Sequence, residues 1–99
     1  MEEKIFAKLG RAAVLEQLAE EAAEVAQAAL KMARIIRGEN PTPKTACEAA
    51  EALEEEMADV IVCMRVLETG SIVIDVENVE KIAEVKMKRW LERLENMRG

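Results

Sequence analysis

The sequence predicts an all-α fold, a helical bundle of three long helices and a short N-terminal helix that is completed by dimerisation. Hydrophobic residues make up 51% of the 99 residues but aromatic residues only 2%, so the core must be built from aliphatic side chains. Glycines and prolines are few, and they divide the chain into long uninterrupted segments. Within these segments apolar residues recur at steps of three and four, as on one face of a helix. The length favours one domain, residues 1–99.

The first two helices are separated by a glycine. A short helix is predicted over Glu2–Leu9, and Gly10 interrupts it. A long helix is predicted over Arg11–Arg37, with Gly38 as its stop, because glycine is the preferred residue just past a helix C-terminus.

The third helix has two possible starts. Thr42 followed by Pro43 is typical of an N-cap with proline in the first helical position. Thr45 followed three residues later by Glu48 is typical of a capping box. The sequence does not choose between them, and the helix continues from either to about Glu68.

A strand-like stretch and a further N-cap precede the last helix. The β-branched segment "SIVI" (Ser71–Ile74) interrupts the helical pattern, but a lone strand is not stable, so no sheet is expected. Asp75 is a suitable N-cap for a final helix that reaches about Asn96.

Each long helix carries a predicted apolar stripe through which it should pack. The stripes comprise Leu18, Ala22, Val25, Ala29, Met32 and Ile36 on the second helix, Leu53, Met57, Val60, Met64 and Leu67 on the third, and Val76, Val79, Ala83, Met87, Trp90, Leu94 and Met97 on the last. The helix predicted over Arg11–Arg37 would measure about 40 Å along its axis. One small chain cannot cover so much apolar surface, so a homodimer or homotetramer is expected, with Trp90 in the core or at the subunit interface.

The composition excludes several classes of protein. A formal net charge of -6 argues against a nucleic-acid partner, and the absence of histidine excludes catalytic triads and Glu-x-x-His metal sites. Cys47 and Cys63 have neither zinc nor redox spacing, so both are interpreted as reduced packing residues. No signal peptide or membrane span is recognisable, and a cytoplasmic location is expected.

Two eight-residue stretches nearly match, "LAEEAAEV" (Leu18–Val25) and "LEEEMADV" (Leu53–Val60), and both read Leu, any residue, Glu, Glu, any residue, Ala, an acid, Val. On a helical wheel the fourth and seventh residues of each stretch, both acids, fall about 60° and about 120° to the same side of the predicted stripe. These acids are Glu21 and Glu24 on one helix, and Glu56 and Asp59 on the other. If the two helices pack through their stripes, four carboxylates converge.

Converging carboxylates repel one another unless a cation lies between them. Oxygen ligands suit Mg²⁺, for which Mn²⁺ could substitute, whereas zinc would require histidine or paired thiolates. The competing interpretation is a solvated helix face, because the acid-rich chain contains other E-x-x-E pairs, such as Glu48 with Glu51 and Glu92 with Glu95. The shared position of the four acids beside both stripes favours the metal site.

In these residues the chain resembles the MazG-like members of the all-α nucleoside triphosphate pyrophosphohydrolases, over about Leu15 to Leu94. The family pattern is E-x-x-E on one helix and E-x-x-D on the next, followed by a basic last helix. That last motif is matched by "EVKMKRW", which contains Lys86 and Arg89. The gap between Glu24 and Glu56 is longer than is usual for the family, and the Tyr-His pair of the phosphoribosyl-ATP enzymes is missing.

The resemblance implies Mg²⁺-dependent hydrolysis of a nucleoside triphosphate, NTP or dNTP, to the monophosphate and pyrophosphate. It implies that Glu21, Glu24, Glu56 and Asp59 bind the metal, and that Lys86 and Arg89 bind the triphosphate. Glu21 or Glu24 would act as the general base. Gln17 lies on the same wheel edge as these two acids and could reach the base or ribose.

Two other functions compete with this one. The chain could be a catalytically inactive helical dimerisation module related to the same family, although a scaffold has no reason to keep four acids in this position. A redox metal bundle held by carboxylates is disfavoured by the lack of histidine. Base and sugar preference are not predictable from the sequence.

Overall fold

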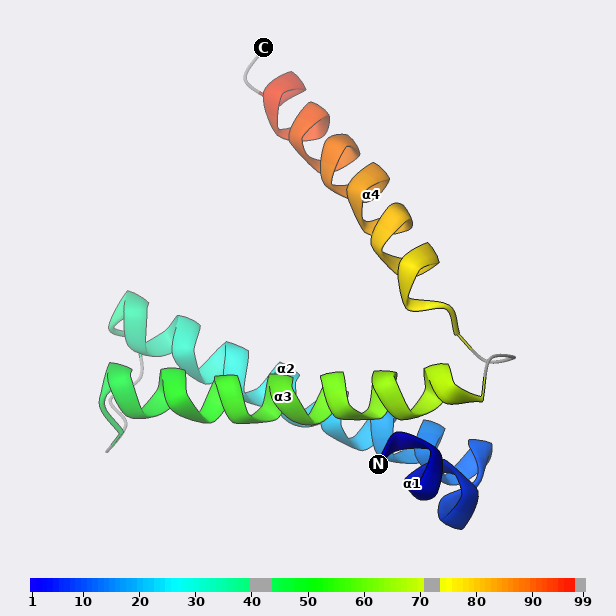
Figure 1. Ribbon diagram of the computed structural model, residues 1–99. Coiled ribbons are helices and arrows are strands. Elements are labelled where there is room, and N and C mark those ends of the chain that lie inside the picture. The colour runs from blue at the N-terminus through cyan, green and yellow to red at the C-terminus, as the bar shows by residue number, and fades with distance from the viewer. Residues whose placement is uncertain (40–43, 71–73, 98–99) are drawn as a thin grey trace.

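The computed structural model of the chain describes residues 1–39, 44–70 and 74–97 (Figure 1). In these ranges it contains four α-helices and no strand: α1 (Glu2–Leu9), α2 (Arg11–Arg37), α3 (Ala46–Thr69) and α4 (Val76–Asn96). The all-α prediction and the four predicted helices are confirmed. The strand-like stretch Ser71–Ile74 lies outside the described residues except for Ile74, which is not helical.

Local capping explains where α2 ends. Gly38 adopts a left-handed conformation with φ 67°, which favours a residue without a side chain. The Gly38 N–H donates to the Ile35 carbonyl and the Glu39 N–H to the Arg34 carbonyl, both at 3.1 Å. These two bonds form a Schellman motif, which satisfies carbonyls that the helix end leaves unpaired.

The start of α3 resolves the choice that the sequence left open. Thr45 is the N-cap, because its Oγ1 accepts a hydrogen bond from the Glu48 N–H at 3.1 Å. In return Glu48 Oε1 accepts from the Thr45 N–H at 3.0 Å, which completes the capping box. The hydrogen bond from the Thr45 backbone N–H to the carboxylate, and after it the Thr45 side chain, lower the pKa of Glu48. The alternative start at Thr42 and Pro43 lies outside the described residues.

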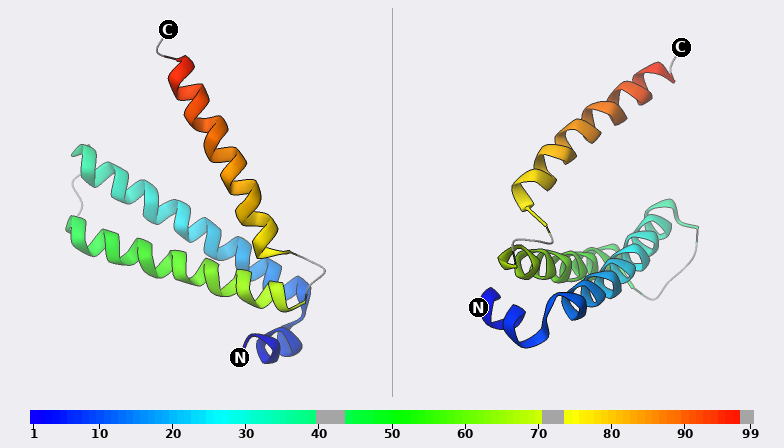
Figure 2. Two further views of the ribbon diagram at one scale, coloured as in Figure 1. Left: turned by 45° about the horizontal axis from the view of Figure 1, so that its top comes forward. Right: turned by 90° about the vertical axis from the view of Figure 1, so that its right-hand side faces the viewer.

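The core lies where α1 meets the antiparallel pair of α2 and α3 (Figures 1 and 2). It is small: Val14 of α2 packs with Val66 and Leu67 of α3. Phe6, Leu18 and Ile74 pack against this cluster and are partly buried. The long α2–α3 pair extends away from this core, and it is this pair that positions the predicted acids.

The stripe on α2 is rotated from the predicted one. The predicted members Ala22, Ala29 and Ile36 are exposed, whereas the α2 residues with reduced exposure are Ala13, Val14, Leu18, Glu21, Val25, Ala28, Met32, Ala33 and Ile35. The prediction is confirmed for Leu18, Val25 and Met32. It was wrong for the other three members, because it counted alanines as apolar and kept acids out. Alanine costs little to leave in water, and Glu21 occupies an inner position.

The predicted stripe on α3 is found except at Met57: Leu67 is buried, and Leu53, Val60 and Met64 are partly buried. Ala49, Cys63, Val66 and Leu67 are buried, and Glu56 is partly buried between them along the helix. The predicted stripe member Met57 is 50% exposed instead. Glu56 therefore belongs to the face that meets α2, rather than to the edge beside it.

Helix α4 projects away from the α2–α3 pair (Figures 1 and 2). Asp75 caps it as predicted, with Oδ1 accepting from the Glu77 N–H at 3.0 Å. No residue of α4 is buried, and Trp90 is 64% exposed. Of the two places predicted for Trp90, the core of the single chain is therefore wrong, and the subunit interface stays a prediction. The radius of gyration of 17.1 Å exceeds the roughly 13 Å of a compact domain of this length. Dimerisation stays a prediction.

None of the helices in the described ranges has a stretch long and apolar enough to cross a membrane.

Truncation of Leu67 should destabilise the chain strongly. Leu67 has no solvent exposure and lies at the centre of the only core cluster in the described residues. We expect Leu67→Ala to lower the free energy of unfolding by about 2–5 kcal/mol, from lost burial and the cavity left behind. Chemical denaturation measures this change. Leu30→Ala, at a position that is 59% exposed, should change it by about 0.5 kcal/mol or less, and equal effects of the two substitutions would contradict the assigned core.

Candidate metal centre

Three of the four predicted acids converge between α2 and α3. Glu21 and Glu24 of α2 and Glu56 of α3 each place one carboxylate oxygen within 4.8 Å of the others. The two α2 acids lie three residues apart, almost one helical turn, and α3 brings the third from the opposite side. The two helices therefore supply ligand-type oxygens to one small volume, although acidic clusters are common on proteins that bind no ion.

Asp59 lies at the edge of this trio rather than within it. It is exposed, and its oxygens are not among the mutually close set. It is still near enough to act on the others, because its charge raises the pKa of both Glu21 and Glu56. The predicted convergence of four acids is therefore seen for three, with the fourth beside them.

Two carboxylate oxygens among Glu21, Glu24 and Glu56 are shielded from water and have no hydrogen-bond donor in the described part of the chain. Glu21 Oε2 and Glu56 Oε2 are inaccessible to solvent and accept no hydrogen bond from the described residues. A buried carboxylate oxygen without a donor is costly, and either a proton or a cation would satisfy it. Oxygen donors of this kind are those that Mg²⁺ prefers, so the residues present fit the ion that the sequence predicts.

Two carboxyl groups of the trio, those of Glu21 and Glu56, hold their protons more tightly than isolated ones. The pKa of Glu56 is raised to about 7, first because its carboxyl donates a hydrogen bond to Glu24, then by burial and by repulsion from Glu24, Asp59 and Glu21. A hydrogen bond from Gln17 lowers the pKa of Glu21, but burial and the charges of Glu24 and Asp59 outweigh it, and the net shift is upward. The arrangement is thus short of positive charge.

Gln17 holds Glu21 in place. Its Nε2 donates to Glu21 Oε1 at 2.7 Å, one helical turn away. The sequence suggested that Gln17 reaches a base or ribose, but in the single chain its amide is engaged with the acid. Gln17 is therefore placed to orient Glu21.

A thiol lies behind the acids. Cys63 is buried, and burial, followed by the charges of Glu21 and Asp59, raises the pKa of its thiol. Its interpretation as a packing residue fits this position. Cys47 is exposed, so the same interpretation is wrong for that residue in the single chain. The two thiols are unpaired.

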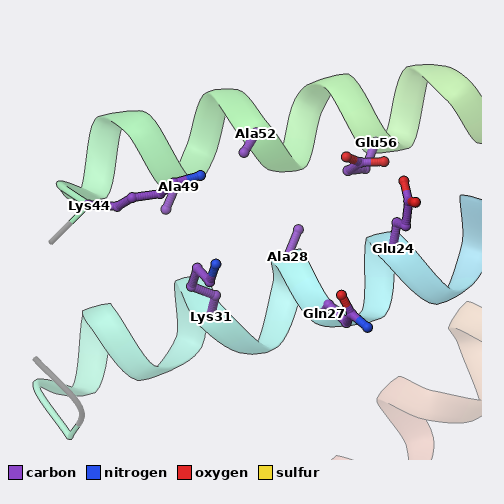
Figure 3. A pocket seen from close by; sticks show the side chains of 8 residues that line it. All are labelled: Glu24, Gln27, Ala28, Lys31, Lys44, Ala49, Ala52 and Glu56. Carbon is purple, nitrogen blue, oxygen red and sulfur yellow. The ribbon is translucent and has the colours of Figure 1, made fainter. Parts of the chain in front are cut away.

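A pocket of about 290 Å³ opens between α2 and α3 beside the trio (Figure 3). Glu24 and Glu56 point toward one another at one end, and Lys31 and Lys44 lie at the other. The lining residues between the two ends are Gln27, Ala28, Ala49 and Ala52. The pocket therefore has an acidic end and a basic end, joined by small side chains.

The two lysines of this pocket were not predicted from the sequence. Lys31 follows Glu24 by seven residues, which is two helical turns, so it lies on the same face of α2. That spacing was a usable signal. Lys44 precedes the N-cap of α3, and its place opposite Lys31 depends on how the two helices pair.

The predicted phosphate-binding residues Lys86 and Arg89 lie elsewhere in the single chain. Both are on α4, where they line a shallow depression with Lys81, Ile82 and Val85. Helix α4 diverges from α2 and α3, which carry the acids (Figure 1). A single chain therefore does not bring Lys86 and Arg89 to the three converging carboxylates.

Comparisons with protein-family models, with curated proteins and with solved structures found no match to this chain. The resemblance to the MazG-like family therefore stays a prediction that depends on the motif residues alone.

The metal-free protein should lose stability as the pH rises from about 4.5 to about 7. The unfolded chain releases the Glu56 proton near the ordinary value of 4.5, whereas the folded chain keeps it until about 7. Folding is therefore favoured by this group below pH 4.5, and the advantage is gone above pH 7. The raised pKa of Glu21 acts in the same direction.

Thermal unfolding in the presence of a chelator, at several pH values, measures this effect. Glu56→Gln should flatten the profile over this interval, whereas Glu55→Gln, at an exposed neighbouring position, should leave it unchanged. A wild-type profile that rises over the same interval would contradict the raised pKa.

Proposed function

We propose that the protein is a Mg²⁺-dependent nucleoside triphosphate pyrophosphohydrolase, which converts an NTP or dNTP and water to the monophosphate and pyrophosphate. The observation that carries the proposal is the set of three carboxylate oxygens within 4.8 Å on two helices. Two of the carboxylates also have a buried oxygen without a partner. The resemblance in motif residues supplies the reaction class.

Two of the proposed Mg²⁺ ligands line the pocket, and the other two lie next to them. Glu24 and Glu56 face the pocket, and Glu21 and Asp59 adjoin them. When bound, Mg²⁺ would neutralise phosphate charge and make a water molecule more acidic. The raised pKa values support the proposal, since the group lacks the positive charge that a cation supplies.

The proposed reaction forms one bond and breaks one. The oxygen of water attacks the α-phosphorus, and the bond from that phosphorus to the bridging oxygen of the pyrophosphate group breaks. The proton of the water passes to a carboxylate, for which the sequence offered Glu21 or Glu24. Glu24 is the better candidate, because it is exposed to the pocket, whereas Glu21 Oε1 is engaged by Gln17.

A screen for pyrophosphate release tests the proposed function. It covers canonical, deoxy and modified nucleoside triphosphates with Mg²⁺, and with Mn²⁺ in its place. The described residues of the pocket include no aromatic side chain to stack on a base, so we expect activity on several bases. Absence of pyrophosphate release from every substrate would refute the enzymatic function and leave the alternative.

That alternative is the catalytically inactive dimerisation module, and α4 is the feature that favours it. Large apolar side chains on α4 are exposed, among them Met87, Trp90, Leu91 and Leu94. Exposed apolar stripes of this size mark interaction surfaces. The two functions are separated by turnover, because both require the helices to associate but only the enzyme requires the acids.

We also propose that the chain forms a homodimer or homotetramer through α4. A core with five buried hydrophobic residues among those described is small for this length, and the α4 stripe has no cover in the single chain. Lys86 and Arg89, on the same helix, stay candidates for the triphosphate if a partner subunit brings α4 over the pocket. A cytoplasmic location stays a prediction of the sequence.

Charge on the α4 stripe should dissociate the oligomer. We expect Leu94→Asp to yield monomers at micromolar concentration, whereas the wild type sediments as a dimer or tetramer. Glu92→Gln, two residues away on the same exposed helix, is the control and should keep the oligomer. A wild type that sediments as a stable monomer would contradict the assembly.

A further inference from the structure

The basic end of the α2–α3 pocket lies at a definite distance from the acids. Glu24 and Lys31 are separated by seven residues of one helix, an axial rise of about 10 Å. The facing segment of α3 spans the same length, since Glu56 and Ala49 are also seven residues apart and both line the pocket. The pocket is thus an elongated cleft with opposite charges at its two ends.

The middle of the cleft offers little besides space. Ala28, Ala49 and Ala52 line it, so it has no aromatic side chain for stacking, and Gln27 is its one uncharged polar side chain among the described residues. At about 290 Å³ it lies at the lower limit of small-molecule sites, which enclose roughly 300–1,000 Å³. Such a cleft suits a narrow, charged chain better than a planar base.

Lys31 has no ion pair or hydrogen bond with the described residues of the chain. Lys44, at the same end, lies close enough to Glu48 for its charge to lower the pKa of that residue. A lysine is a point charge that suits phosphate oxygens. The ligand of this end should therefore be anionic, while the opposite end demands a cation.

We propose that Lys31 and Lys44 bind the distal phosphates of a polyphosphate chain whose proximal end is held through a cation by Glu24 and Glu56. This inference rests on the proposed function and specifies its substrate: the α-phosphate lies at the acids, the β- and γ-phosphates extend along the alanines, and the nucleoside remains outside the cleft. Lys31 is then a binding residue for the leaving pyrophosphate. The assignment differs from that of Lys86 and Arg89, which the single chain places on α4.

Calorimetric binding of inorganic tripolyphosphate in the presence of Mg²⁺ tests the assignment without any turnover. We expect Lys31→Ala to weaken binding about tenfold or more, the usual loss for a charged hydrogen bond. Lys31→Arg should recover most of the affinity, and Lys44→Ala should weaken binding in the same direction. Lys8→Ala removes the same charge from an exposed position on α1 and should bind as the wild type does.

The outcomes separate this inference from the function on which it rests. Equal affinity of Lys31→Ala and Lys8→Ala for tripolyphosphate would overturn the inference, as would a wild type that does not bind the probe. The metal centre would survive either result if Mg²⁺ still raises the unfolding temperature of the wild type. Loss of that Mg²⁺ effect, with Lys31-dependent binding of tripolyphosphate retained, would instead refute the metal centre and leave a polyphosphate site.

Discussion

Replacement of Glu56 by glutamine is expected to lower kcat/KM for nucleoside triphosphate hydrolysis by at least about 100-fold. Loss even of a residue that only supports a metal ligand costs about 10–100-fold, and Glu56 is proposed to be a ligand itself. It is also the α3 member of the trio of carboxylate oxygens that lie within 4.8 Å. Steady-state measurement of pyrophosphate release gives the change directly.

The fold should tolerate this substitution. Glu56 is repelled by Glu24, Asp59 and Glu21, so a neutral amide of the same shape should leave the unfolding temperature of the metal-free protein unchanged or higher at pH 8. Glu55→Gln is the matched control, since it removes the same charge from an exposed adjacent position. If Glu56→Gln retains wild-type turnover, or if Glu55→Gln is equally damaged, the assignment of the centre is wrong.

Addition of Mg²⁺ should raise the unfolding temperature of the wild type. Binding to the folded state alone contributes about 1.4 kcal/mol at a free Mg²⁺ concentration of about ten times Kd. For a chain of this length that corresponds to a rise of about 6–11 °C. Differential scanning fluorimetry over a range of Mg²⁺ concentrations measures the shift, which should be larger at pH 8 than at pH 6 because Glu56 must lose its proton.

Variants of the acids distinguish a specific site from general charge screening. Glu24→Gln should remove most of the rise, and Asp59→Asn should reduce it less, since Asp59 lies outside the trio. Glu20→Gln, next to Glu21 but exposed, should respond as the wild type does. If all three variants gain the same stabilisation as the wild type, Mg²⁺ does not bind at the proposed centre.

Features encoded within a few residues of the chain were predictable. The N-cap Asp75, the C-cap Gly38 and the capping box at Thr45, one of two starts that the sequence offered, depend on hydrogen bonds between residues at most five positions apart. Such short spacings can be read from a sequence directly. Residues three positions apart on one helix, such as Glu21 and Glu24, are neighbours by helix geometry alone, so their proximity was predictable too. For this reason the helix bounds and the acids were anticipated.

The faces of the helices were less predictable. The predicted stripe on α2 was apolar, yet the inner face includes Glu21, and α3 turns Glu56 toward it. A pattern of hydrophobicity cannot reveal acids on an inner face, because it assumes that apolar residues alone are buried. Alanines such as Ala22 and Ala29 mislead in the opposite sense, since they are tolerated in water.

Relations between helices were predictable only in part: the acids indicated that α2 and α3 pair, and three of the four do meet. The position of Lys44 opposite Lys31 depends on the pairing of α2 with α3, and the direction of α4 depends on few contacts within the chain. The amphipathic pattern of α4 indicated that its apolar stripe packs against another surface, but the pattern does not identify that surface. The assembly must therefore be determined in solution.

The position of water attack tests the central claim most directly. The wild type is incubated in ¹⁸O-water with Mg²⁺ and a nucleoside triphosphate that the screen identifies, and the products are analysed by mass spectrometry. Attack at the α-phosphorus, which we predict, places the label in the nucleoside monophosphate and leaves the pyrophosphate unlabelled. Label found only in pyrophosphate or in free phosphate would contradict the proposed reaction.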